Sequence, residues 1–298
     1  MQGRCAAGLL VCLLGLVSPA VLSGESGPCV VDDAERRVCL QAPARRIVSL
    51  SPGATELLFA AGAGEWIEGT VRYSDYPAAA KRIPRVGTHS RFDIEKLLAL
   101  SPDLVVAWIS GNPAEQVERL QALGMTVYYS EPRRFEDVSS TLERLGLLAG
   151  TTDVARTAIA EFNAAIDELE ARYRDADPVP IFYQIWDDPL MTVNDSHLIS
   201  QAIELCGGRN VFGAADRLVP RLDRESVLAA APEAIVAGGM GEDDTGWLEA
   251  WERFPGFTAV RRGNLFFVPP SYIQRPTPRV AEGSRILCEH LETARGRR

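Results

Sequence analysis

The chain has 298 residues, of which 46% are hydrophobic and 24% are charged, so we expect one or two globular domains with a sizeable core. Its formal net charge of -9 and isoelectric point of about 5.0 argue against nonspecific binding to nucleic acid. Only 3 histidines are present, and their spacing does not form the cluster that a protein metal site needs.

The N-terminus has the pattern of a secretory signal peptide. Arg4 precedes the apolar run 6–17, and Ser18-Pro19-Ala20 places small residues at the usual cleavage positions. The apolar run is too short for the ~20 residues of a membrane-spanning helix. We therefore predict a cleaved signal peptide over residues 1–20, with an uncleaved anchor as the alternative. A lipid anchor is disfavoured because no cysteine follows a Leu-x-x pattern at the cleavage zone.

Four cysteines remain after this segment: Cys29, Cys39, Cys206 and Cys288. An even number in an exported chain favours disulfides, and four cysteines allow three pairings. Residues 29–39 have the pattern of a short hairpin whose arms a Cys29–Cys39 bond could join, which would leave Cys206 to pair with Cys288. Four free thiols and a zinc site are the alternatives.

Strands alternate with helices through the first half of the mature chain. The predicted elements are a strand at 46–50, a helix from about 56 to 62, a strand at 67–71, a helix that begins at 93, a strand at 104–108, a helix at 113–123, a strand at 126–129 and a helix at 135–149. This alternation predicts an α/β fold with a mostly parallel, doubly wound sheet.

One long helix interrupts this alternation. Apolar residues recur at helical spacing from Thr152 to about Arg174, and the breaker Asp177-Pro178-Val179-Pro180 follows. The alternation then restarts, with strands at 181–185, 234–236 and 265–268, and with a helix at 198–205, one that begins at 223, one at 248–254 and one from about 279. We therefore expect an N-terminal lobe over 21–150, a linking helix over 151–177 and a C-terminal lobe over 178–298.

Two segments of 15 residues, 93–107 and 223–237, repeat the same pattern. Each begins with an aspartate that suits a helix N-cap, has a glutamate two residues later and continues through a proline into a short buried strand. The repeat indicates one α/β module used twice. Glu95 and Glu225 are either ordinary first-turn charges, worth under ~1 kcal/mol each, or two matched contacts for arginines of a symmetric partner.

Aromatic residues follow several predicted strands, at the sheet edge where α/β proteins bind ligands. They predict a wide apolar pocket for a large ligand: Tyr73, Tyr76, Trp108, Trp186 and Tyr272. His89 is either a surface residue or an axial ligand to a metal carried by the ligand itself. Arg275 is a candidate contact for an anionic or amide group.

Sequence motifs of common enzymes are missing. The chain has no Gly-x-Ser-x-Gly, no phosphate loop with Gly-Lys-Ser/Thr and no His-Glu-x-x-His. We therefore expect no enzymatic activity and no catalytic cofactor, although an exported α/β hydrolase or metal-dependent enzyme is the alternative from another functional class.

From about residue 46 to 291 the chain resembles the periplasmic cobalamin-binding proteins of ABC importers. The matching motifs are Ser49-Leu50-Ser51-Pro52 with Thr55-Glu56-Leu57, Tyr73-Ser74-Asp75-Tyr76-Pro77, Ala99-Leu100-x-Pro102-Asp103-Leu104-Val105, Gly111-Asn112, Cys206-Gly207-Gly208-x-Asn210-x-Phe212 and Pro278-Arg279. The resemblance implies two Rossmann-like lobes, mostly parallel sheets, one long connecting helix and a ligand cleft between the lobes.

The resemblance also implies roles for particular residues. Glu95 and Glu225 match the glutamates that meet arginines of the membrane permease dimer, and Cys206 and Cys288 match the family's disulfide. Tyr73, Trp108 and Arg275 match ligand contacts. The expected protein is therefore a monomeric periplasmic receptor that carries a corrinoid to an ABC importer.

Two positions depart from the family pattern. His89 stands where such a protein can have a tryptophan, and haem carriers of the same superfamily place an iron-ligating tyrosine near there. Ser271 replaces an expected acidic residue near the ligand. A haem or ferric-siderophore carrier is therefore the alternative within this class.

Overall fold

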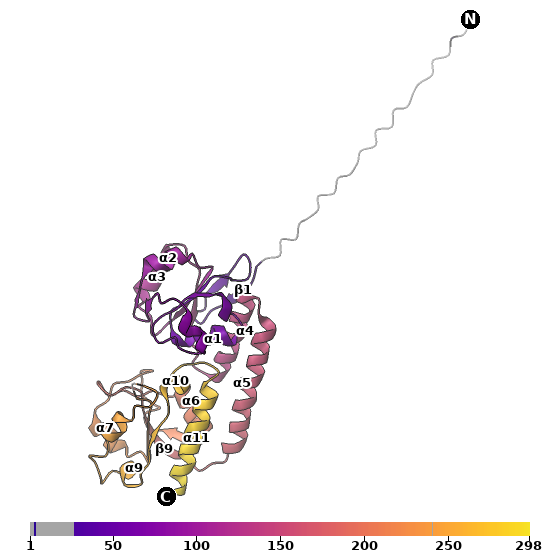
Figure 1. The fold of residues 1–298 in the computed structure, drawn as a ribbon. Helices are drawn as coiled ribbons and strands as arrows, with labels where there is room; N and C mark the ends of the chain where they lie inside the picture. The colour runs from indigo at the N-terminus through magenta and orange to yellow at the C-terminus, as the bar shows by residue number, and fades with distance from the viewer. Residues whose placement is uncertain (1–2, 4–26, 240) are drawn as a thin grey trace.

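The computed structural model consists of two α/β lobes that lie one above the other beside a long helix (Figure 1). The structure describes residue 3, residues 27–239 and residues 241–298. Apart from Gly3, the predicted signal peptide lies outside the described residues. Within the described part of the chain, no helix is long and apolar enough to cross a membrane.

The N-terminal lobe is built on a four-stranded parallel sheet with the strand order β4-β3-β7-β8. Its strands are β3 (Ile47–Ser49), β4 (Ile67–Gly69), β7 (Leu104–Trp108) and β8 (Val127–Ser130). Its helices are α1 (Pro52–Ala60), α2 (Ile94–Leu100), α3 (Ala114–Ala122) and α4 (Phe135–Ala149). Two 3₁₀ turns (Gly64–Trp66, Ala78–Arg82) and the small hairpin β5 (Gly87–Thr88) and β6 (Arg91–Phe92) complete the lobe.

The C-terminal lobe repeats this topology, with the strand order β10-β9-β11-β12. Its strands are β9 (Val179–Gln184), β10 (Gly208–Asn210), β11 (Ala234–Ala237) and β12 (Leu265–Phe267). Its helices are α6 (Leu198–Leu205), α7 (Arg224–Ala230), α8 (Gly246–Glu249), α9 (Thr258–Arg261), α10 (Pro270–Ile273) and α11 (Val280–Gly296). In both lobes the first strand pairs with the second and the third, so the lobes are topological copies. The prediction of two parallel α/β lobes is confirmed.

The predicted linking helix is α5, which spans Thr152–Tyr173. It packs against α1 and α4 of one lobe and against α6 and α11 of the other. Its buried residues Phe162, Ile166 and Leu169 belong to one apolar cluster that also contains Leu142 and Leu287, one from each lobe. Because a shared core resists separation, α5 joins the lobes as a packed support rather than as a flexible linker.

The repeated segments fold alike. Asp93 accepts a hydrogen bond from the Lys96 backbone N–H at 3.1 Å, and Asp223 accepts one from Ser226 at 2.7 Å, so both are N-caps. The two helices end at residues in the left-handed region, Ser101 (φ 44°) and Ala231. Each helix leads into the third strand of its sheet, which confirms the prediction of a duplicated module.

Several element boundaries differ from the sequence-based expectation. Helix α1 begins four residues early, at Pro52, because Ser51 caps it and proline suits the first helical position. Strand β9 begins at Val179, before Pro180, whose missing N–H does not prevent pairing there. The helix expected over 248–254 is only the short α8, and turns follow it.

Both predicted disulfides are present, Cys29–Cys39 and Cys206–Cys288. The first joins strands β1 (Cys29–Val31) and β2 (Arg37–Cys39), whose hairpin covers the outer edge of β8. The Asp32 carboxylate accepts a hydrogen bond from the Tyr129 N–H at 3.2 Å, and Arg36 donates to the Val127 carbonyl at 2.9 Å. The hairpin thus satisfies edge groups that would otherwise be open to pairing with another chain.

Replacing Asp32 should therefore destabilise the N-terminal lobe. Its buried carboxylate also accepts hydrogen bonds from Ala34 and Arg36, so Asp32→Ala leaves several donors without their acceptor. We expect the free energy of unfolding to fall by about 2–4 kcal/mol. Urea denaturation measures this loss, and Arg37→Ala, an exposed change in the same hairpin, serves as the control. Equal losses in both variants would contradict this role for Asp32.

A histidine cap makes the C-terminal lobe sensitive to acid. His197 is the N-cap of α6, and its Nδ1 accepts a hydrogen bond from the Ile199 N–H at 3.1 Å. Burial, reinforced by the nearby Arg133, lowers the pKa of His197 to about 4. The unfolded state, with a histidine pKa of about 6.5, binds more protons in this window, so stability is lost as the pH falls from about 6.5 to about 4.

The variant His197→Asn keeps a capping oxygen but cannot titrate. Between pH 7 and pH 4 we expect wild type to lose about 1–3 kcal/mol more stability than this variant. Urea denaturation at a series of pH values measures the difference, and parallel curves for the two proteins would show that His197 does not titrate as described.

Candidate functional site

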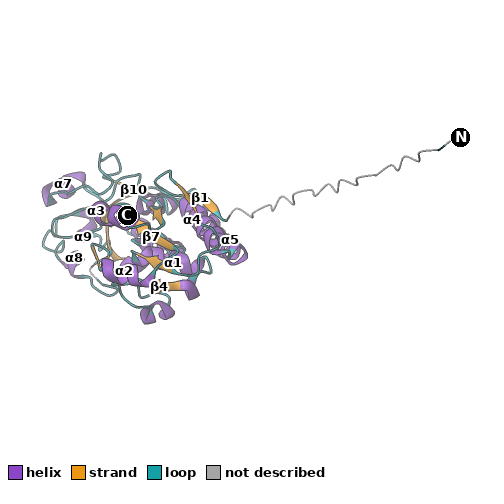
Figure 2. Cartoon of the chain, turned by 90° about the horizontal axis from the view of Figure 1, so that it is seen from above, coloured by secondary structure: helices purple, strands orange, loops and turns teal. Residues whose placement is uncertain are grey.

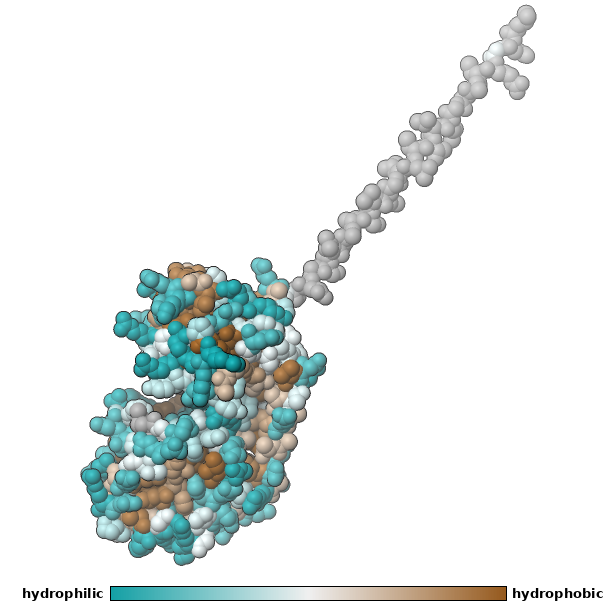
Figure 3. Space-filling model, in the orientation of Figure 1, coloured by the Kyte–Doolittle hydropathy of each residue, from teal (hydrophilic) through white to brown (hydrophobic). Residues whose placement is uncertain are grey.

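The loops that follow the carboxyl ends of the strands in the two lobes meet each other. Glu56 of α1 follows β3 and Asp75 follows β4, whereas Arg275 and Arg279 follow β12 and α10. Side chains from these loops are in direct contact across the lobes. Figure 3 shows a hollow between the lobes, on the side away from α5. Since α/β sheets bind ligands at the carboxyl ends of their strands, this inter-lobe hollow is the candidate site.

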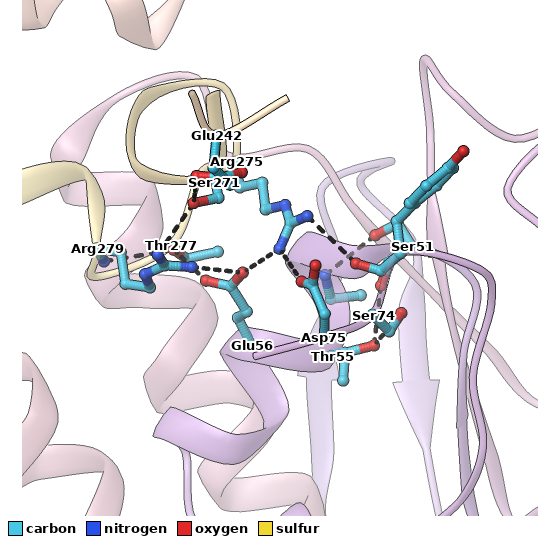
Figure 4. A network of polar contacts seen from close by, with 12 residues as sticks. Ser51, Thr55, Glu56, Ser74, Asp75, Glu242, Ser271, Arg275, Thr277 and Arg279 are labelled. Carbon is cyan, nitrogen blue, oxygen red and sulfur yellow. Dashed lines mark hydrogen bonds and ion pairs between the residues drawn. The ribbon is translucent and has the colours of Figure 1, made fainter. Parts of the chain in front are cut away.

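A buried ion cluster joins the lobes at this position (Figure 4). The Glu56 carboxylate accepts hydrogen bonds from Arg275 at 2.7 Å, from Thr277 at 3.0 Å and from Arg279 at 3.3 Å. Arg275 also donates to the Asp75 carboxylate at 2.9 Å and to the Tyr73 carbonyl at 3.2 Å. We call Glu56, Asp75, Arg275 and Arg279 the inter-lobe cluster.

Burial and charge act in opposite directions on Glu56. The residue is only 3% exposed, and burial raises the pKa of its carboxyl group, while Arg275 and Arg279 oppose the rise by favouring the ionised form. Arg279 lies between the rings of Tyr76, 4.1 Å away in one lobe, and Tyr272, 4.2 Å away in the other. The cluster therefore combines ion pairs with cation–π contacts that also cross the interface.

A network of hydrogen-bonded, buried hydroxyl groups anchors the loop that carries Tyr73. The Thr55 hydroxyl lies 2.6 Å from that of Ser49, 2.7 Å from that of Thr70 and 3.0 Å from that of Ser74. Tyr73 itself has a left-handed backbone (φ 67°) and a side chain on the surface, with 66% of the residue exposed. The packing beneath fixes this strained backbone and leaves the aromatic ring free to meet a ligand.

Trp108 and His89 lie next to each other in the N-terminal lobe. Their ring centroids are 6.2 Å apart. The Asn112 side chain donates to the His89 carbonyl at 2.8 Å and accepts from the Trp108 N–H at 2.7 Å, so one amide positions both residues. Gly111 lies against the Trp108 ring, where a Cβ would come within 1.9 Å of a ring carbon.

Trp186 lies at the end of the central strand β9 in the other lobe. Its ring packs edge-on against Trp247 with centroids 5.9 Å apart, and its indole N–H donates to the Asp188 carbonyl at 3.0 Å. Trp186 remains 42% exposed. Such a large ring, fixed in position yet accessible, is suited to contact a flat apolar ligand.

The predicted ligand residues fall into three groups. Tyr73, Tyr272 and Arg275 belong to or touch the inter-lobe cluster, His89 and Trp108 form a pair in the N-terminal lobe, and Trp186 lies in the C-terminal lobe. The described residues contain no group of three or more His, Cys, Asp or Glu side chains that could hold a metal ion.

The sequence analysis missed the importance of Glu56, Asp75 and Arg279. All three were named only as members of the family motifs. Their contacts join residues about 200 or more positions apart, so no local spacing reveals them. A glutamate on the buried face of a helix that is otherwise apolar is the one local signal, because a buried carboxylate needs a partner.

Glu95 and Glu225 are both exposed, in the first turns of α2 and α7. Figures 1 and 2 place these two helices on the side of the molecule opposite α5, one on each lobe. The two carboxylates therefore lie on the surface, one on each lobe.

A second concavity lies elsewhere. A groove of about 850 Å³ runs between α4, α5 and α6, and no predicted ligand residue lines it. We favour the inter-lobe hollow as the ligand site because it lies at the carboxyl ends of the strands, beside the exposed Tyr73 and the arginines of the inter-lobe cluster.

The comparisons with known proteins agree with this geometry. Residues 47–272 match the model of the periplasmic binding protein family. The chain is 33% identical over 256 residues to a vitamin B12-binding protein of Vibrio campbellii, covering 86% of this chain and 92% of that one. It is 32% identical over 248 residues to a vitamin B12-binding protein of Yersinia pestis, covering 83% and 86%.

Among solved structures, the periplasmic vitamin B12-binding protein of Vibrio cholerae superimposes with a TM-score of 0.78 at 31% identity, covering 85% of this chain and 98% of that one. A periplasmic haem-binding protein of Roseiflexus has a TM-score of 0.74 at 23% identity, covering 84% and 99%, which shows a shared fold alone. The matched family model and these relatives cover most of the chain, and it therefore belongs to the periplasmic binding protein family.

Proposed function

We propose that this protein captures cobalamin or a related corrinoid between its lobes and delivers it to an ABC importer in the inner membrane. The observation that carries the proposal is the 33% identity to a vitamin B12-binding protein over 86% of the chain. Export to the periplasm with removal of residues 1–20 and action as a monomer complete the proposal. The protein then binds and releases its ligand without changing it.

The arrangement of side chains in the hollow supports a large, flat ligand. Tyr73 is exposed beside the arginines of the inter-lobe cluster, Trp108 ends strand β7 of the N-terminal sheet, and Trp186 follows strand β9 of the C-terminal sheet. A corrin ring offers an extended face for aromatic contact and a periphery of amide groups for hydrogen bonds. His89 is close enough to Trp108 to contact the axial side of such a ring.

A haem or ferric-siderophore carrier is the alternative within the family. The haem-binding protein of Roseiflexus shares the fold at 23% identity, and His89 could serve as an axial ligand to iron. The corrinoid proposal is favoured because the vitamin B12-binding relatives are more similar in sequence over the same span. An exported hydrolase is disfavoured by the family membership, since this family consists of substrate-binding proteins.

Titration with cyanocobalamin tests the proposal directly. We expect near-stoichiometric binding of one corrinoid per chain in isothermal calorimetry, because fixed rings on both lobes need little reorganisation. No heat with cyanocobalamin, together with retention of added haem on a desalting column, would replace the corrinoid proposal by the haem alternative.

The role of Trp108 can be separated from general stability. Trp108→Ala should weaken cyanocobalamin binding by about 5–30-fold, because a well-positioned ring is lost from the site. Trp66→Ala is the matched control, since Trp66 packs under Arg45 in the same lobe and outside the hollow. Calorimetry on both variants distinguishes the two effects, and an equal loss of affinity would argue against a direct contact from Trp108.

The proposed docking role of Glu95 and Glu225 has its own test. Reversing both charges with Glu95→Lys and Glu225→Lys should abolish corrinoid uptake through the reconstituted importer but leave corrinoid affinity unchanged, because the carboxylates lie outside the hollow. Glu115 and Glu249 offer a matched control pair, as exposed glutamates in the first turns of α3 and α8, one on each lobe. Loss of ligand affinity in the first pair, or equal loss of uptake in both pairs, would refute the docking role.

A further inference from the structure

Arg275 contacts the backbone of Tyr73, a residue whose side chain is exposed, but the charge of Arg275 is already paired with carboxylates. Its Nη1 donates both to Glu56 and to Asp75, at 2.7 and 2.9 Å, and its Nη2 donates to the Tyr73 carbonyl. The inter-lobe cluster contains two guanidinium groups and two carboxylates, so these charges cancel. A ligand that approaches Arg275 therefore does not meet an unpaired positive charge.

Arg275 nevertheless retains hydrogen-bond donors. A guanidinium group has five N–H bonds, and the contacts above use three of them. Among residues 27–239 and 241–298, Nε and the second Nη2 hydrogen of Arg275 form no hydrogen bond. The side chain is 17% exposed, so part of it reaches the surface beside Tyr73. Arg275 can therefore donate to an acceptor from outside.

Asp75 determines which acceptor is favoured. Its side chain is 50% exposed, whereas that of Glu56 is only 2% exposed. A neutral carbonyl can accept a hydrogen bond from Arg275 without penalty. A carboxylate at the same place would be repelled by the exposed charge of Asp75 and would gain little from a guanidinium group that two carboxylates already neutralise.

We infer that Asp75 is a specificity-determining residue, which makes Arg275 a donor for neutral amide carbonyls and disfavours ligands that present a carboxylate there. This inference rests on the proposed function, because it concerns the amide periphery of a corrinoid. It extends that proposal because it assigns to the Asp75 side chain the preference for an amide over a carboxylate group on the ligand. It also accounts for an arginine that is close to the ligand site and yet unsuited to bind an anion.

The test compares cyanocobalamin with its monocarboxylates, in which one peripheral propionamide has been hydrolysed to the acid. Calorimetric titrations of each monocarboxylate isomer give the affinity ratio of amide to acid. With wild type we expect the amide form to bind about 10-fold more tightly than at least one isomer. Asp75→Asn should lower this amide-to-acid affinity ratio by about 3–10-fold. The difference between the ratios of wild type and Asp75→Asn should be smaller in high salt.

The control must remove the same charge elsewhere. Asp153 is an exposed aspartate on α5 that pairs with Arg156 at 3.2 Å, so Asp153→Asn changes the net charge equally but leaves the inter-lobe cluster intact. This control should keep the wild-type ratio for every isomer. Asp75→Ser, which also removes the charge, should lower the ratio as Asp75→Asn does, and thermal unfolding of each variant checks that the protein is folded.

The outcomes separate this inference from the proposed function. If wild type binds cyanocobalamin but Asp75→Asn and Asp75→Ser leave the ratio unchanged for all isomers, the inference is overturned and the proposed function stands. An equal change in Asp153→Asn would also overturn it, since net charge alone would then explain the result. If wild type binds no corrinoid in either form, the proposed function fails and the inference fails with it.

Discussion

The structure depends on one buried carboxylate that the two lobes share. Glu56 comes from α1 of the N-terminal lobe, and its partners Arg275, Thr277 and Arg279 come from the C-terminal lobe. A carboxylate this deeply buried is costly without partners, and removing one member of such a cluster leaves the others uncompensated. If the lobes separated, Glu56 and its arginine partners would all lose their ion pairs at once. The inter-lobe cluster therefore opposes opening of the hollow.

This cluster is one attachment between the lobes. The apolar core along α5, which includes side chains from both lobes, is another. A single attachment would leave the lobes free to rotate about it, whereas two that lie on different elements restrict that rotation. The two sides of the hollow consequently keep their relative positions before a ligand arrives, and a preformed site loses less entropy on binding.

The sequence predicted the features that local patterns encode. Helical spacing predicted α5, and the repeated capping aspartates Asp93 and Asp223 predicted the duplicated module. The hairpin pattern around Cys29 and Cys39 predicted that disulfide. The amino-acid sequence did not predict the inter-lobe cluster, because Glu56 and Arg275 are 219 positions apart and neither belongs to a periodic pattern. Arg275 was predicted to contact an anionic or amide group of a ligand, and the structure adds that Glu56 and Asp75 already bind it.

The two lobes share their backbone topology but differ in the side chains of their loops. Both sheets have the same strand order, and both contain a capped helix, α2 or α7, before the third strand. The loops beyond the strands differ: one lobe contributes Glu56, Asp75 and Tyr73, and the other contributes the arginines. Opposite charges on opposite lobes attract, whereas two identical loops facing each other would repel. The divergence of these loops is therefore what allows two copies of one module to close over a shared site.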